Sequence, residues 1–420
     1  EVRKAGGVYY TPKWVVDYIV SNTVGELTRD KKPENVAKLR ILDPACGSGS
    51  FLIGALNYLF KLHLDYYAKN LKEAKHGTLF PHLVIEHDED DNVNYRLSIE
   101  TKGQILRNNI YGVDIDPQAC EITMMSLYIK VLEGEKTLPH NKELLPSLSN
   151  NIRCGNSLIE FDFLSQQSLV SDAEKEKANP FEWRSKTTGF GNIISENDGF
   201  DAIIGNPPYI RIQTMKEWAP KEVDYYPTKY KTAASGNYDI YVLFVERAVQ
   251  LLSDKGLFGF IMPHKFFQAE YGANLRKLIA EGKLLREIVN FTDQQVFDQA
   301  TTYTHLLFLS KASKKEFKYA EICKLENPIS QLATIKKNIE YENHTLRVGM
   351  LSIANVTDLS WCFGSAKEMA LIERLNGMGT MLAEVCPKIF QGVITGLDKV
   401  FILEVEHTDA REVIEGYSNA

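Results

Sequence analysis

Short apolar segments alternate with longer amphipathic segments through the first three quarters of this 420-residue chain. The short segments have the length and composition of strands and span residues 40–43, 110–114, 202–204, 257–262, 287–291 and 305–309. Segments with helical periodicity span residues 14–27, 51–70, 117–132, 238–252 and 273–281. Because strand–helix alternation places helices over both faces of one sheet, the pattern predicts an α/β fold with a mainly parallel, doubly wound sheet.

The composition is that of an ordinary globular protein, with 44% hydrophobic and 25% charged residues. The net charge of -7 disfavours a protein that simply coats nucleic acid, whereas an enzyme acting on DNA needs a basic surface only where the DNA lies. No apolar run has the length of a membrane span, and no signal peptide is evident. The scattered cysteines favour reduced thiols in a prokaryotic cytoplasm. We interpret His82, Glu86 and His87 as part of a solvated acidic loop, and we expect no metal site.

A strand–turn–helix signature covers residues 41–51, whose sequence is Ile-Leu-Asp-Pro-Ala-Cys-Gly-Ser-Gly-Ser-Phe. Its two glycines let the backbone approach a ligand closely, and the start of the following helix presents free N–H groups. A nicotinamide or flavin dinucleotide is one candidate ligand, but its fingerprint requires a third glycine where this chain has Leu52. The segment therefore favours a methyl donor, S-adenosylmethionine, over a dinucleotide.

A second strand-to-helix junction occupies residues 109–117, and its strand ends on Asp114. In doubly wound folds, a carboxylate at the end of the second strand accepts hydrogen bonds from ribose hydroxyls, and Asp114 fits that role. Asp116 stands just before Pro117 and is predicted to cap a helix. The polar stretch 72–103 between the two motifs is predicted to be an insertion.

An apolar strand at residues 200–205 stops at the tetrapeptide Asn206, Pro207, Pro208 and Tyr209. Two prolines stiffen the loop at the strand end, where open α/β sheets place their sites. An amino group conjugated to an aromatic ring is a poor nucleophile. Two acceptors on its hydrogens, the Asn206 side-chain oxygen and the Pro207 carbonyl, would aim its lone pair at a methyl donor. Tyr209 offers a flat face for stacking a base.

These motifs, in this order after Tyr10-Thr11-Pro12, resemble those of gamma-class amino-methyltransferases acting on DNA, of the TaqI type. More narrowly, the chain looks like the methyltransferase part of type IIG and related single-chain restriction-modification enzymes. The resemblance implies a Rossmann-like S-adenosylmethionine-dependent fold. It also implies contacts to that cofactor from Tyr10, Thr11, Pro12, Asp43, Pro44, Ala45, Cys46, Gly47, Asp114, Ile115, Asn156 and Ser157.

Two further residues take their expected roles from the same resemblance. Many relatives have Asp where this chain has Asn156, which puts its contact with the cofactor's adenine in question. Phe297 resembles the aromatic residue that packs on the extruded target base opposite Tyr209, and the alternative is a core Phe. Residues 210–236 carry lysines among tyrosines, which suits either phosphate contacts on a mobile loop or an ordinary exposed loop.

The resemblance implies a site-specific methyltransferase that flips an adenine out of double-stranded DNA and methylates its N6. The expected domains are the methyltransferase, 1–325, and a linker with a truncated target-recognition domain, 326–420, which includes the family-like segment 392–401. No nuclease motif is found, so cleavage is expected only from a missing upstream domain. The alternatives are a protein-glutamine methyltransferase, an RNA methyltransferase, and a non-catalytic DNA-binding subunit of a defence complex.

Overall fold

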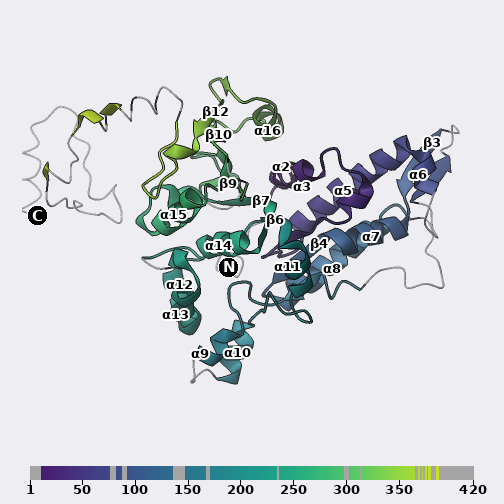
Figure 1. Ribbon diagram of the computed structural model, residues 1–420, viewed down its shortest axis with the longest axis horizontal. Helices are drawn as coiled ribbons and strands as arrows, with labels where there is room; N and C mark the ends of the chain where they lie inside the picture. The colour runs from purple at the N-terminus through teal and green to yellow at the C-terminus, as the bar shows by residue number, and fades with distance from the viewer. Residues whose placement is uncertain are drawn as a thin grey trace, which may run out of the picture. The chain divides into compact units, whose positions relative to one another are not determined.

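The computed structural model describes residues 11–75, 82–87, 92–135, 147–166, 171–233, 236–297, 302–312 and 314–364, with 368, 371, 374–375, 377–379 and 385–386. The chain divides into two compact units, Glu1–Ser365 and Ala366–Ala420. The first unit contains the central sheet and the two motif loops, which are the glycine turn at residues 44–49 and the tetrapeptide at residues 206–209 (Figure 1). None of the described helices is long and apolar enough to cross a bilayer.

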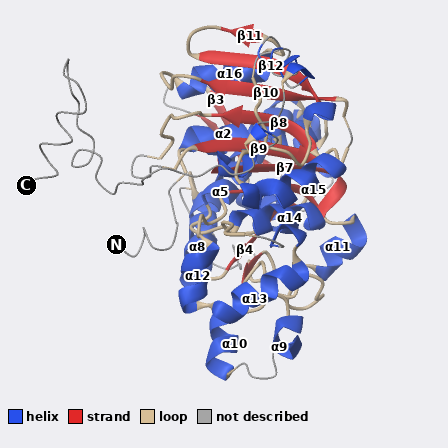
Figure 2. Cartoon of the chain, turned by 90° about the vertical axis from the view of Figure 1, so that its left-hand side faces the viewer, coloured by secondary structure: helices blue, strands red, loops and turns tan. Residues whose placement is uncertain are grey.

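A ten-stranded sheet runs through the first unit in the order β11-β12-β10-β8-β9-β7-β6-β1-β4-β5 (Figure 2). Its strands are β1 (Ile41–Asp43), β4 (Ile110–Asp114), β5 (Ile152–Cys154), β6 (Phe200–Gly205), β7 (Leu252–Pro263), β8 (Leu285–Asn290), β9 (Thr304–Ser310), β10 (Glu316–Ile322), β11 (Tyr341–Glu342) and β12 (Leu346–Ser352). The pairs from β7 through β6, β1 and β4 to β5 are parallel, whereas β9 runs antiparallel to both β7 and β8. The predicted α/β fold is confirmed, with a mixed rather than mainly parallel sheet.

Helices cover both faces of this sheet. One face packs against α2 (Lys13–Asn22), α5 (Ser50–Lys69), α7 (Ile99–Asn109), α8 (Pro117–Leu132) and α16 (Pro328–Lys337), whose apolar residues share one core with those of the strands. On the other face, α14 (Tyr241–Leu251) packs on β7, and α15 (Ala273–Glu281) lies beside α14 (Figure 2). The shorter helices are α3 (Val24–Thr28), α4 (Pro33–Val36), α6 (Leu71–Lys75), α9 (Asp162–Gln166), α10 (Asp172–Ala178), α11 (Gly191–Asn197), α12 (Ile212–Trp218) and α13 (Pro220–Lys229).

The order of the strands reverses at β1. The chain passes from β1 to β4 and β5 on one side, and then returns to place β6 on the other side of β1. Ile41 pairs with Ile110 on one side and with Ala202 on the other, so the three strands end at the same edge. Open α/β sheets bind ligands outside the carboxyl ends of the strands at such a reversal. The glycine turn and the tetrapeptide therefore emerge side by side at that point.

Three expectations about organisation differ from the structure. The predicted insertion holds a hairpin of β2 (Leu83–His87) and β3 (Val93–Leu97) and the start of α7, so Glu86 and His87 lie in a strand rather than a loop. Within 210–236, the described residues Ile212–Trp218 and Pro220–Lys229 form two helices, because their apolar residues have a buried side. The sheet continues past residue 325, since β12 pairs with β10, and the division between compact units falls after Ser365.

Candidate active site

Main-chain hydrogen bonds fix the glycine turn after β1. The Cys46 amide donates to the Val113 carbonyl at 3.0 Å, and the Gly49 amide donates to the Cys46 carbonyl at 2.8 Å. Gly47 and Gly49 have φ values of +53° and +85°, in the left-handed region that favours glycine. A Cβ on Gly49 would lie 3.0 Å from the Thr123 side chain, whereas a Cβ on Gly47 would meet no atom within 4 Å. The turn is therefore tightly packed at Gly49 and open at Gly47.

The Asp114 carboxylate joins this turn to the start of α8. It accepts hydrogen bonds from the Gly47 amide at 2.8 Å and from the Asp116 amide at 3.0 Å. Burial raises the pKa of Asp114, and these amide donors act against the rise. The predicted cap is confirmed, because Asp116 accepts from the Gln118 amide at 2.9 Å. Next to Asp114, the Ile115 side chain is 48% exposed, which leaves an apolar surface beside a carboxylate.

Asp43 stands where the glycine turn meets β6. Its carboxylate is buried and accepts a hydrogen bond from the Ala45 amide at 3.1 Å. A Cβ on Gly205 would lie only 2.7 Å from the Asp43 Oδ1 atom, so the close approach of these two strand ends requires glycine there. Burial raises the pKa of Asp43 to about 8, and the nearby Asp114 adds to the rise. Sequence reasoning placed Asp43 beside the cofactor but did not find its contact with Gly205.

Side-chain hydrogen bonds hold the tetrapeptide. The Asn206 Nδ2 atom donates to the Thr11 Oγ1 atom at 3.1 Å. The Tyr209 hydroxyl lies 2.6 Å from the Asn206 Oδ1 atom and 3.1 Å from the Ile261 carbonyl, and its single proton is shared between these acceptors. The Tyr209 ring meets Tyr241 edge-on, with centroids 6.2 Å apart. In this arrangement the Asn206 oxygen already accepts a hydrogen bond from the chain's own tyrosine.

The Thr-Pro element and the prolines of the tetrapeptide lie at the same edge of the sheet. Thr11 is buried, and Pro12 is the residue that precedes α2. Pro207 is buried and Pro208 is half-buried. Tyr10 lies outside the described residues. The Thr11–Asn206 hydrogen bond therefore brings together two sequence motifs that are 195 residues apart.

The structure buries Phe297, leaving 4% of it exposed, within the same core that Tyr209 packs against. This burial matches the alternative of a core phenylalanine in the present conformation. Its role in stacking on a target base stays a prediction, as do the other roles assigned to single residues.

Asn156 and Ser157 follow β5 and are both buried. The Ser157 hydroxyl donates to the Pro44 carbonyl at 2.5 Å, which ties this segment to the glycine turn. The Asn156 Oδ1 atom accepts from the Leu158 amide at 3.0 Å, and its Nδ2 atom lies 3.4 Å from a carboxylate oxygen of Glu222. Burial raises the pKa of Glu222 to about 7. Sequence reasoning missed Glu222 because residues 210–236 were expected to form a loop.

Residues 210–236 were expected to be either a mobile phosphate-binding loop or an ordinary exposed loop, and both forms of this expectation are wrong, because the described part is helical and its tyrosines are buried. Tyr226 and Tyr230 are each 1% exposed. Of the predicted phosphate-binding lysines, Lys221 pairs with Glu174 at 2.8 Å, and Lys229 pairs with Asp162 and Glu160. The basic side chains exposed on this segment are Arg211, Lys216 and Lys231.

Comparison with known sequences is consistent with these motifs. The sequence model of the Eco57I restriction-modification methylase family matches residues 108–297. The chain is 36% identical over 318 residues to the type II restriction enzyme and methyltransferase RM.Eco57I of Escherichia coli, a match that covers 75% of this chain and 29% of that protein. It is 25% identical over 414 residues to the type II methyltransferase M.BstVI of Geobacillus stearothermophilus, covering 96% of this chain and 61% of that protein. The chain thus spans less than two thirds of either relative.

Comparison with solved structures concerns the fold alone. The chain of a DrdV-DNA complex, determined by cryo-electron microscopy, matches with a TM-score of 0.50 and 17% sequence identity, covering 81% of this chain and 30% of that chain. The resemblance predicted from the motifs is confirmed, because the chain is similar to the Eco57I restriction-modification methylase family over residues 108–297 and to RM.Eco57I over 75% of its length.

Proposed function

We propose that this chain transfers a methyl group from S-adenosylmethionine to the N6 amino group of an adenine that is flipped out of duplex DNA. The observation that carries the proposal is the junction of the two loops at the strand reversal. Asp43 contacts Gly205, and Asn206 follows directly and bonds to Thr11. An amide acceptor is therefore held beside an open glycine turn, as transfer between two ligands requires.

The glycine turn and its neighbours fit the proposed cofactor. Open space lies over Gly47, the half-buried carboxylate of Asp114 can accept from ribose hydroxyls, and Ile115 exposes an apolar face next to it. Ser157 and Asn156 border the same turn. When bound, S-adenosylmethionine supplies an electrophilic methyl group.

The tetrapeptide supplies positioning rather than a strong base. The Asn206 Oδ1 atom and the Pro207 carbonyl would each accept one hydrogen of the target amino group, which orients the nitrogen lone pair. The Asn206 oxygen already accepts from the Tyr209 hydroxyl. We infer that Tyr209 turns away when a base enters, which leaves both lone pairs of that oxygen to the substrate and offers the ring face for stacking.

The substrate, the biological setting and the domain plan belong to the same proposal. The names of the relatives describe type II restriction enzymes and methyltransferases, which supports a place in a restriction-modification system. The predicted plan placed the catalytic domain at 1–325 and the start of a target-recognition domain at 326–420. Because β12 extends the sheet and the first compact unit ends at Ser365, we propose that the catalytic domain reaches that residue. The segment 392–401, which prompted the assignment of a target-recognition domain, lies outside the described residues.

A single assay tests the proposed reaction against its alternatives. The chain would be incubated with S-adenosylmethionine that carries a tritiated methyl group, in three separate reactions. One reaction contains duplex DNA, one RNA and one protein. We expect label in DNA alone and, after digestion to nucleosides, in N6-methyladenine alone. Label in protein or RNA would support the corresponding alternative. Cofactor binding without transfer to any substrate would support the non-catalytic one.

A further inference from the structure

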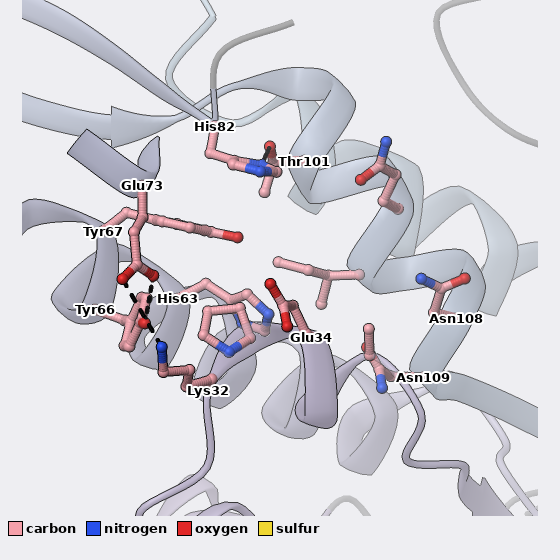
Figure 3. Close-up of a pocket in the computed structure, with 14 residues that line it drawn as sticks. Lys32, Glu34, His63, Tyr66, Tyr67, Glu73, His82, Thr101, Asn108 and Asn109 are labelled. Atoms are coloured by element: carbon pink, nitrogen blue, oxygen red, sulfur yellow. Dashed lines mark hydrogen bonds and ion pairs between the residues drawn. The ribbon is translucent and has the colours of Figure 1, made fainter. Parts of the chain in front are cut away.

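A cavity of about 530 Å³ lies at the opposite edge of the sheet from the motif loops (Figure 3). Ala37 lines it just before β1, and Asn109 lines it just before β4, so the cavity opens at the amino ends of these strands. Residues of α4, α5 and α7 and the start of the β2–β3 hairpin supply its walls. This volume is within the range of small-molecule sites, about 300–1,000 Å³. The proposed methyl transfer makes no use of it.

One ring nitrogen, the Nε2 atom of His63, faces the cavity without a partner among the described residues. The His63 Nδ1 atom lies 2.8 Å from the Leu59 carbonyl, so it carries the hydrogen, and the Nε2 atom of the neutral ring is an acceptor. Burial lowers the pKa of His63, which keeps the ring neutral. His63 is 3% exposed and points into the cavity in Figure 3. The Oδ1 atom of the fully buried Asn109 is also unbonded, but it is closed off from solvent and does not face the cavity, while its Nδ2 atom donates to two carbonyls.

A stacked aromatic pair forms another wall. The rings of Tyr67 and His82 lie 4.5 Å apart with an interplanar angle of 8°, and Figure 3 shows Tyr67 directed into the cavity below His82. The Nδ1 atom of His82 lies 3.0 Å from the Thr101 hydroxyl, which fixes the orientation of the ring. The stacked rings of this pair give a planar ligand an apolar surface to pack against, and the Tyr67 hydroxyl lies at the end of that surface.

The remaining polar groups select the chemistry of the ligand. Gln104, which is exposed, and Asn108, which is half-buried, lie four residues apart on α7, and each amide offers a carbonyl acceptor beside an NH₂ donor. That pairing matches a ring nitrogen beside an exocyclic amino group, as on adenine. Glu34 and Glu73 outnumber the one lysine of the lining, Lys32, which disfavours a phosphate.

We propose that this cavity is a second ligand site, distinct from the methyl-transfer site, that binds an uncharged amino-bearing nucleobase or nucleoside. The flat wall of Tyr67 and His82, the His63 Nε2 acceptor and the amides on α7 recognise the base. The carboxylates of Glu34 and Glu73 exclude nucleotides. The site lies on the opposite edge of the sheet from Asn206 and Gly47, so its occupancy does not require displacement of a ligand there.

The test is calorimetric titration of the full chain with adenosine, repeated with saturating S-adenosylhomocysteine to block the proposed cofactor site. We expect one equivalent of adenosine to bind in the presence of S-adenosylhomocysteine, and any further equivalent that binds without it belongs to the proposed cofactor site. Asn108→Leu and Gln104→Leu should each weaken binding roughly tenfold, since a paired amide contact is lost. The matched control Gln250→Leu, an exposed glutamine on α14, should leave it unchanged. Inosine, which lacks the amino group, and adenosine 5′-monophosphate should bind at least about tenfold more weakly than adenosine.

Several outcomes would overturn the proposal. These are no binding at millimolar adenosine, equal binding of adenosine and inosine, loss of binding with S-adenosylhomocysteine, or wild-type affinity in both α7 variants. The experiment distinguishes a failure of the proposed methyl-transfer function from a failure of the proposed second ligand site. A chain that does not bind S-adenosylhomocysteine contradicts the cofactor assignment, while the α7 variants still report on this cavity.

Discussion

The glycine turn and the tetrapeptide lie at the same edge of the sheet but are held in different ways. Main-chain groups and the Asp114 carboxylate fix the turn, with Thr123 donating to the Gly47 carbonyl at 2.8 Å. The tetrapeptide is held by side-chain bonds, and one of them occupies the Asn206 oxygen that the proposed reaction needs. The turn is therefore fixed without the tetrapeptide, whereas one of the two lone pairs of the Asn206 oxygen is held by Tyr209, and we propose that this bond is exchanged when a base enters.

The largest effect expected from this difference is at Asn206. Asn206→Ala removes the acceptor for the target amino group, and we expect methyl transfer to fall by at least about a thousandfold. The glycine turn is fixed independently, so affinity for S-adenosylmethionine should change less than about threefold. Initial rates with duplex DNA and calorimetric titration of the cofactor give the two values. If the methyl-transfer rate and the cofactor affinity fell together in a variant that still unfolds cooperatively, the glycine turn and the tetrapeptide would depend on each other.

The reverse pattern is expected at Asp114. Asp114→Asn replaces one carboxylate oxygen by an NH₂ group, which faces the amide of either Gly47 or Asp116. We expect cofactor affinity to fall roughly tenfold to a hundredfold, because one unpaired donor costs about 1–3 kcal/mol. Asp116→Asn is the matched control, since asparagine caps helices about as well as aspartate. If the control loses as much affinity, the effect belongs to the start of α8 and not to Asp114.

The same contrast explains how much the sequence could predict. The strand 110–114 and the helices 117–132 and 273–281 were predicted with their observed bounds, because periodicity, a proline and an aspartate cap mark them locally. Residues 210–236 were misread as a loop, because Lys and Pro obscure the buried side of α13 and Pro227 lies inside that helix. The Tyr209–Asn206 hydrogen bond had no sequence signal, since it depends on the rotamers of neighbouring side chains.

The Tyr209 hydroxyl provides a sharper test of the change of hydrogen bonds. Tyr209→Phe removes the bond to Asn206 and keeps an aromatic face, so we expect methyl transfer within about fivefold of the parent rate. Tyr209→Ala also removes the face and should weaken target binding by roughly 1–3 kcal/mol. Steady-state kinetics on one duplex, with fluorescence of 2-aminopurine at the target as a readout of flipping, separates the two. A Phe variant as impaired as the Ala variant would mean that the hydroxyl acts in the reaction itself.

The smallest effect concerns the support behind the glycine turn, where Glu222 reaches Asn156. Burial raises the pKa of Glu222 from 4.5 to about 7, so between these values the unfolded chain releases a proton that the folded chain keeps. This carboxyl therefore lowers stability as pH rises from about 4.5 to 7, and the loss is complete above the folded pKa. Glu222→Gln keeps an acceptor for Asn156 without a charge.

Urea unfolding at a series of pH values measures this contribution. The Gln variant should match the parent at pH 5 and exceed its free energy of unfolding by at least about 1 kcal/mol at pH 8. Because Asp43 titrates in both proteins, the difference between them isolates Glu222. A constant difference across this range would mean that Glu222 is already ionised at low pH. In that case the hydrogen bond from Asn156 would go to an ionised Glu222 carboxylate and not to a neutral carboxyl group.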